Sequence, residues 1–188
     1  MFDPLDTDYS EVRARLEELL ATRPTPTGVA VASSIDPATL GQDESLLLAQ
    51  VLDKHIAFLT GRQLAAVAQV AGPEPDGCSD AEDWVREEVA ISLGLSTAAA
   101  ERRITLARRL AHVLPATSKA LLRGEIGFLH ALNMSEKTAV LSDEDAGVVE
   151  MAVLLKSPDR TLRVLQQHQT QRHEGRPRLC TGTSRAHC

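Results

Sequence analysis

Hydrophobic residues recur at helical spacing along most of the chain. In residues 43–71, apolar side chains return every three or four positions for about eight turns, which predicts one long, buried helix. A shorter amphipathic helix is expected over residues 10–22, with Ser10 as its N-cap. Between the two, residues 23–39 are rich in Pro and Thr and show little periodicity, so we expect a linker or an ordered loop there.

Shorter periodic segments follow, and residues that start or stop helices stand between them. Asp80 and Ser96 are placed to cap helices, and Gly94 and Gly124 are placed to end them. Beyond residue 166 no apolar period remains, and we expect a disordered tail over residues 167–188. The predicted helices of this part lie at about 81–93, 97–113, 115–123, 127–140, 143–156 and 158–165.

The composition is that of a helical protein. Hydrophobic residues make up 43% of the chain, mostly Leu and Ala, whereas aromatic residues make up only 3%. Because strands favour β-branched and aromatic residues, this balance predicts an all-α fold and argues against a sheet-based enzyme. With 188 residues, we expect a single multi-helix domain at 43–166. An N-terminal helix and linker at 1–42 precede it, and the tail at 167–188 follows it.

The net charge of −6 is unevenly distributed. Residues 1–100 are acidic and residues 151–188 are basic, so an anionic partner would meet the second half of the chain. The first residues lack the pattern of a signal peptide, and no apolar run is long enough to span a bilayer. We therefore expect a cytoplasmic protein without membrane contact. The odd set of Cys78, Cys180 and Cys188 predicts no disulfide framework.

Residues 88–104 have the spacing of a helix-turn-helix hairpin. Ala90 is small where two such helices approach most closely, and Gly94 suits the left-handed turn between them. We expect Leu93 of the first helix to be buried against the second. The predicted buried stripe of the second helix comprises Ala100, Ile104, Ala107, Ala111 and Leu114.

Arginines on the second helix are the candidate DNA contacts. Arg102 and Arg109 fall on the face opposite the apolar stripe, where we expect them to be exposed and able to bind phosphates or guanine edges. Arg103 and Arg108 complete the candidate set. Exposed arginines also serve solubility, and the first helix of the hairpin is acidic, which would repel a DNA backbone.

The same region resembles the 13E12 repeat family, whose shared part is catalogued as domain of unknown function 222. The resemblance covers about residues 44–166 and follows an ordered set of motifs. The string from Trp84 to Leu110 contains LGLS, AAERR and ARRL, and LPAT and the GEI…HA pattern come after it. The resemblance implies a helical protein, often encoded in repetitive or prophage-associated loci and frequently joined to a C-terminal HNH nuclease domain.

This sequence shows no HNH pattern of its own. Such a site needs metal-holding His, Asp or Asn residues in a ββα hairpin, and the C-terminal residues carry no strand pattern, no CxxC and no Asp-His pair. The abrupt change at the tail suggests a truncated or frameshifted copy. We expect no catalytic residue, no metal, no cofactor and no small-molecule substrate. A zinc site in the C-terminal residues is also not expected, because the spacing of the candidate ligands matches no known kind of zinc site. These candidates are His168, His173, Cys180, His187 and Cys188.

The sequence therefore predicts a non-catalytic helical module, associated with DNA, linked to a mobile or repetitive element and lacking the nuclease half. The basic balance of residues 151–188 and the arginine face favour DNA. The acidic balance of residues 1–100 favours a different class, a helical module for protein–protein interaction or homo-oligomerisation, and an inactive remnant is a third reading.

Overall fold

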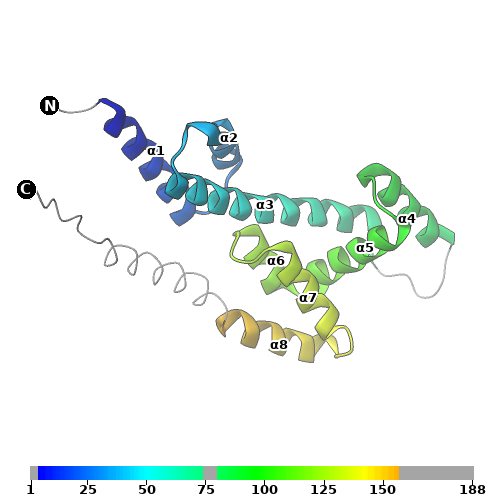
Figure 1. Cartoon of the computed structure of the whole chain (residues 1–188). Coiled ribbons are helices and arrows are strands. Elements are labelled where there is room, and N and C mark those ends of the chain that lie inside the picture. The colour runs from blue at the N-terminus through cyan, green and yellow to red at the C-terminus, as the bar shows by residue number, and fades with distance from the viewer. Residues whose placement is uncertain (1–3, 74–79, 157–188) are drawn as a thin grey trace, which may run out of the picture. The chain divides into compact units, whose positions relative to one another are not determined.

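The computed structural model describes residues 4–73 and 80–156, and these are helical with no strand (Figure 1). The all-α fold expected from the composition is confirmed. The helices are α1 (Pro4–Ala21), α2 (Pro26–Ser34), the short 3-10 helix η1 (Pro37–Thr39), α3 (Gln42–Ala71), α4 (Asp80–Leu93), α5 (Thr97–His112), α6 (Pro115–Leu122), α7 (Phe128–Thr138) and α8 (Asp143–Lys156).

The chain divides into two compact units, Met1–Ala152 and Val153–Cys188. The first unit contains every helix up to most of α8. Of the second unit only the last turn of α8 is described. The predicted helix at 158–165 and the predicted tail at 167–188 lie outside the described residues, so both stay predictions.

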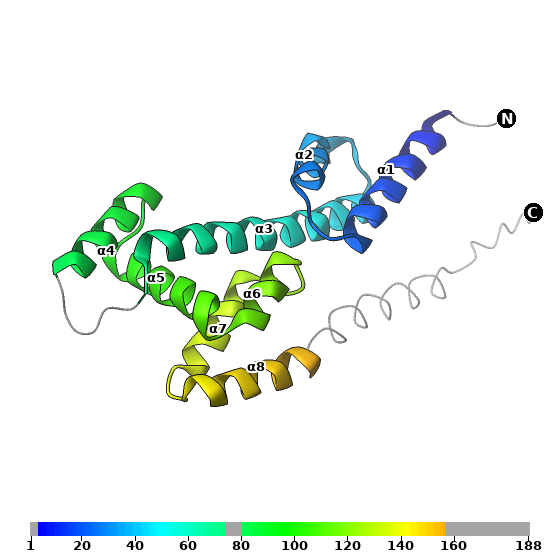
Figure 2. The same cartoon turned by 180° about the vertical axis from the view of Figure 1, so that it is seen from behind.

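Helix α3 contributes to two hydrophobic clusters, and Figures 1 and 2 show the helices that lie along its two halves. Its first half packs against α1 and α2, and its second half packs against α4, α5 and α6. Val51 in the first cluster and Leu64 in the second are thirteen positions apart, which places them about 140° apart around the helix. The 30-residue helix therefore buries different faces in its two halves.

The segment expected to be a loop at residues 23–39 contains α2 and η1, so that prediction was wrong. Pro26 begins α2, where its missing N–H is tolerated, and the Thr25 hydroxyl accepts a hydrogen bond from Gly28 N at 3.0 Å. Ala32 of α2 is buried in the first of the two hydrophobic clusters, which we call the N-terminal cluster. Proline and threonine here start helices rather than break them.

Helix α1 also begins earlier than expected, at Pro4. At its C-terminal end, backbone carbonyls contact a lysine of α3. The Lys54 ammonium donates hydrogen bonds to Leu20 O and to Thr22 O, both at 2.6 Å. These carbonyls have no partner further along α1, so the cation closes the C-terminal end of that helix. Burial lowers the pKa of Lys54, and the nearby carboxylate of Glu125 partly offsets this effect.

Two glycines with positive φ lie in turns that differ in how closely other residues pack against them. Gly94 has φ 63° with no atom within 4 Å of an added Cβ, whereas at Gly124, with φ 68°, a Cβ would lie 2.7 Å from Lys54 O. We expect Gly94→Ala to cost about 1 kcal/mol, from backbone strain alone. Gly124→Ala should cost clearly more, because the α3 backbone cannot move away from the new methyl group. Urea unfolding of both variants measures the difference, and equal costs would contradict this packing.

Candidate functional site

The helix-turn-helix hairpin expected from the sequence is present in α4 and α5. Gly94 adopts the left-handed conformation that ends α4, and the Ser96 hydroxyl accepts a hydrogen bond from Ala99 N at 3.3 Å at the start of α5. Ala90 of α4 and Ala100 of α5 are both buried in the same hydrophobic cluster. The local pattern of small residues therefore gave the correct hairpin.

The hairpin does not leave α5 free, because α5 packs against α3, α4, α6 and α7. The expected burial of Ile104, Ala107 and Leu114 is confirmed, but Leu93 is only half-buried and Ala111 is exposed. A recognition helix needs an open face to enter a DNA groove. The exposed residues of α5 are Thr97, Ala98, Arg102, Thr105, Ala111 and His112.

Arg108 closes the end of α3. Its guanidinium donates from Nε to Gly72 O at 3.1 Å and from Nη2 to Ala71 O at 2.9 Å. These carbonyls belong to the last turn of α3, where a cation also complements the helix dipole. This candidate DNA contact is therefore engaged with the protein's own backbone.

Arg109 is half-buried, so the prediction that it is exposed was wrong. Its Nη2 donates to Thr138 Oγ1 at 2.9 Å, and Thr138 in turn donates to Met134 O at 2.8 Å. The helical wheel placed Arg109 opposite the apolar stripe, but α7 covers that side of α5. The position of α7 depends on contacts between distant residues, which a wheel of one helix does not include.

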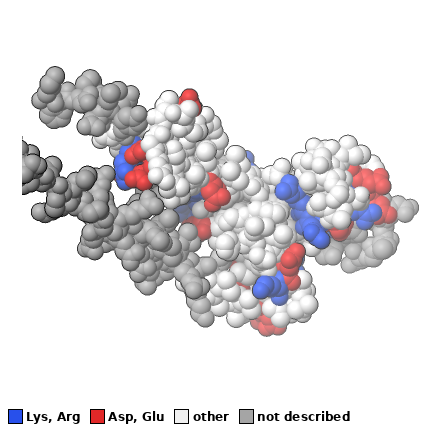
Figure 3. All heavy atoms as spheres, in the orientation of Figure 1, with Lys and Arg blue, Asp and Glu red and all other residues white. Residues whose placement is uncertain are grey.

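The remaining two candidates differ from each other. Arg103 donates from Nη1 to Gln63 Oε1 at 3.1 Å, and its guanidinium lies 5.4 Å from the centre of the Phe128 ring. It therefore ties α5 to α3 and α7. Arg102 is exposed, as expected, and is the candidate that keeps an open position on α5. On the face in Figure 3, basic side chains of the described residues form small separate groups rather than one continuous stripe.

A buried carboxylate that the sequence analysis missed holds α8 in place. Glu150 is only 2% exposed, and its Oε1 accepts a hydrogen bond from Thr117 N at 2.6 Å. Thr117 lies in the first turn of α6, where free N–H groups and the helix dipole favour an anion. Among acidic residues, Glu150 had no local sequence signal that separated it from a solvent-facing glutamate.

An exposed apolar stripe runs along α3. It consists of Ile56, Leu59, Ala66 and Val70, and Gln63 lies within it. The spacing from residue 56 to residue 70 alternates between three and four positions, which keeps these side chains on one line along the helix. Ile56 is 59% exposed, Leu59 48% and Val70 55%. We call this line the α3 stripe.

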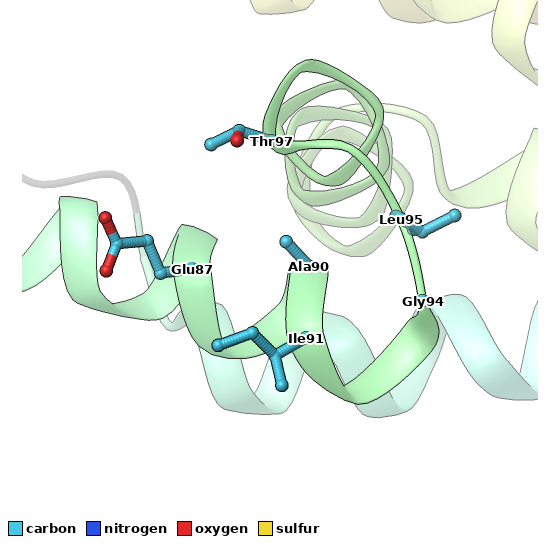
Figure 4. A pocket seen from close by; sticks show the side chains of 6 residues that line it. All are labelled: Glu87, Ala90, Ile91, Gly94, Leu95 and Thr97. Atoms are coloured by element: carbon cyan, nitrogen blue, oxygen red, sulfur yellow. The ribbon is translucent and has the colours of Figure 1, made fainter.

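A groove lies at the turn between α4 and α5 (Figure 4). It has a volume of about 380 Å³. Figure 4 shows Ala90 and Ile91 on α4, Leu95 in the turn and Thr97 at the start of α5, with Glu87 one turn before Ile91. The groove lining is Glu87, Ala90, Ile91, Gly94, Leu95 and Thr97. We call it the hairpin groove.

Other kinds of site have no support in the described ranges. Residues 4–73 and 80–156 contain no group of three or more His, Cys, Asp or Glu side chains arranged to hold a metal ion. None of the helices in these ranges combines the length and the apolar character needed to cross a membrane. The cysteine and histidine residues of the C-terminal tail lie outside these ranges.

Comparison with known proteins identifies a family. The family described as domain of unknown function (DUF222) matches residues 48–170. The chain belongs to the DUF222 family. No curated protein and no solved structure matches the chain. The DUF222 assignment confirms the family resemblance, whereas the 13E12 name and the association with HNH nucleases stay predictions.

The DUF222 region begins within α3 and extends beyond α8. It contains α4 to α8 and all of α3 except residues 42–47, and it excludes α1 and α2. The N-terminal cluster therefore spans the boundary of the family region, because Leu48 and Val51 lie inside the match and Leu16 and Ala32 lie outside it. The boundaries predicted at residues 42 and 166 stay predictions.

A matched pair of arginine variants separates structural from exposed roles. Arg108→Ala removes hydrogen bonds from a charged group to the α3 carbonyls, so we expect a loss of about 1.5–3 kcal/mol in the free energy of unfolding. Arg102→Ala removes the same side chain from an open position and should change that free energy by less than about 0.5 kcal/mol. Chemical denaturation followed by circular dichroism measures both. Equal losses would contradict the different roles of these two arginines.

Proposed function

We propose that this DUF222 chain is a non-catalytic helical interaction module that associates with a second copy of itself through the α3 stripe. The observation that carries the proposal is the exposure of Ile56, Leu59 and Val70 in one line on the longest helix. Isolated apolar residues on a surface need no explanation, but a continuous apolar line on a helix is typical of a docking face.

The pattern of the α3 stripe fits a helix of the same kind. Apolar residues that alternate at three and four positions form the seam of a helix pair. Gln63, the polar residue of this line, is held by the hydrogen bond from Arg103 of the same chain. After Lys54 the only charged residue of α3 is Arg62, and Arg103 of α5 reaches the stripe at Gln63, so the charged groups named at this face are two arginines. The stripe is about 21 Å long, which supports a weak, concentration-dependent dimer.

Helix α8 also exposes apolar side chains, Val148 and Met151 among them. It runs directly into residues 157–170, which belong to the DUF222 match but are not described. The exposed apolar side chains of α8 therefore do not support the proposal, which rests on the α3 stripe.

The arginine positions weigh against DNA association as the main function. Arg103, Arg108 and Arg109 donate hydrogen bonds to other helices, and a DNA contact would have to compete with these bonds. Arg102 alone among the four candidates is exposed. Binding to phosphates depends on several cations acting together.

A charged substitution in the α3 stripe should prevent association through the stripe. We expect Ile56→Glu with Leu59→Glu to weaken the dimer at least about tenfold, because two carboxylates would be desolvated in the seam. Ala139→Glu with Val140→Glu is the matched control, since it adds the same charge in the exposed turn between α7 and α8. Analytical ultracentrifugation over a range of concentrations measures the association, and circular dichroism confirms that both variants fold. A parent chain that stays monomeric throughout would refute self-association.

DNA association is tested separately by retention of duplex DNA at about 50 mM salt. The proposal predicts no retention by the full chain. Retention by a monomeric parent, with Arg102→Ala lowering the slope of log affinity against log salt by about 0.9, would establish DNA binding in place of self-association.

A further inference from the structure

The hairpin groove combines an apolar floor with an acidic rim. Ala90, Ile91 and Leu95 supply the apolar part, and Glu87 stands at its edge (Figure 4). Ile91 is 83% exposed. An apolar anchor from a partner would therefore remove apolar surface from water on both molecules.

The chain's single tryptophan extends this surface along α4. Trp84 lies seven positions before Ile91, which places both on the same face of the helix, and it is 62% exposed. Aromatic side chains are enriched at the centres of protein interfaces, and tryptophan is the most enriched of them. An anchor residue of this kind is already in place on the open face of α4.

The glutamates on this face of α4 carry negative charge that no ion pair in the described ranges neutralises. Glu87 and Glu88 are both exposed, and no ion pair involves either of them within the residues that the structure describes. Arg86, the one basic residue of α4, is engaged with Asp83 and Glu101. A partner that places cations beside Glu87 and Glu88 would gain attraction without breaking an existing pair.

The C-terminal sequence of this chain has the complementary character. Residues 156–178 are basic and contain Arg160 and Arg163 next to Leu162, Val164 and Leu165. Apolar residues between arginines are what an apolar floor with an acidic rim selects. In contrast, the residues up to 100 are acidic and would be repelled.

We propose that the hairpin groove, together with Trp84 and the carboxylates of Glu87 and Glu88, binds the basic segment 156–178 of a second copy of the chain. The apolar side chains of the segment enter the groove, and its arginines pair with the rim. This contact uses α4 and its turn, so it is independent of the α3 stripe and would join copies through a different surface.

The fluorescence emission of Trp84 can report binding at this surface, because Trp84 is the only tryptophan of the chain. The acceptor is the full chain carrying Arg160→Gln and Arg163→Gln, so that its own segment competes less. The probe is a synthetic peptide of residues 156–178, which contains no tryptophan. We expect the peptide to shift Trp84 emission to shorter wavelength in a saturable way, because the indole passes from water into an apolar contact. The affinity should fall as salt is raised.

Matched variants separate docking from general charge attraction. Glu87→Gln with Glu88→Gln should weaken peptide binding about tenfold, which corresponds to about 1.4 kcal/mol. Glu11→Gln with Glu136→Gln removes two exposed carboxylates from α1 and α7 and should leave the affinity unchanged. A peptide in which Leu162, Val164 and Leu165 are replaced by Ser should bind at least about tenfold more weakly.

Three results would overturn the proposal: no shift of Trp84 emission, equal losses in the two glutamate pairs, or equal affinity of the serine-substituted peptide. The stripe variant Ile56→Glu with Leu59→Glu should bind the peptide as the parent does. A chain that does not associate through the stripe but still binds the peptide would refute only the α3 stripe. A chain that associates through the stripe but does not bind the peptide would refute only the hairpin groove.

Discussion

Helix ends leave backbone groups without partners, and in this domain charged side chains from other helices supply them. Lys54 of α3 closes the C-terminal end of α1, and Arg108 of α5 closes the C-terminal end of α3. Glu150 of α8 meets the N-terminal end of α6. The sign of each charge suits the dipole of the helix end that it faces. These contacts join residues 32 to 37 positions apart, so they fix how the helices are arranged as well as where they end.

This use of charge changes the functional interpretation. A helix with several arginines after a glycine turn resembles a DNA-reading element when it is considered alone. In the folded domain α5 is packed against four helices, and Arg108 and Arg109 belong to its interior contacts. What stays on the surface is apolar on α3 and acidic with apolar anchors on α4. Both surfaces suit protein partners better than a phosphate backbone, which is why self-association is the function that we propose.

Local sequence rules predicted much of the fold, because helix periodicity and the residues at helix ends act over a few positions. The long helix ending at Ala71 and the hairpin turn at Gly94 are of this kind. The rules failed at α2, where Pro26 and Thr25 were taken for loop residues although both also start helices. They failed at Arg109 and did not single out Glu150, because the partners of these side chains lie on helices distant in sequence. The α3 stripe was hidden for the same reason: periodicity alone does not say which apolar face finds a neighbour.

The most direct test of the structural role of the α5 arginines is their reactivity toward a dicarbonyl reagent, followed residue by residue by mass spectrometry. Our account predicts that Arg102 reacts fastest among the four candidates. Arg108 and Arg109 should react slowly in the folded chain and at the rate of Arg102 once the chain is unfolded in urea. Equal reactivity of Arg102, Arg108 and Arg109 in the folded chain would show that these guanidinium groups are open to partners, and it would contradict the account.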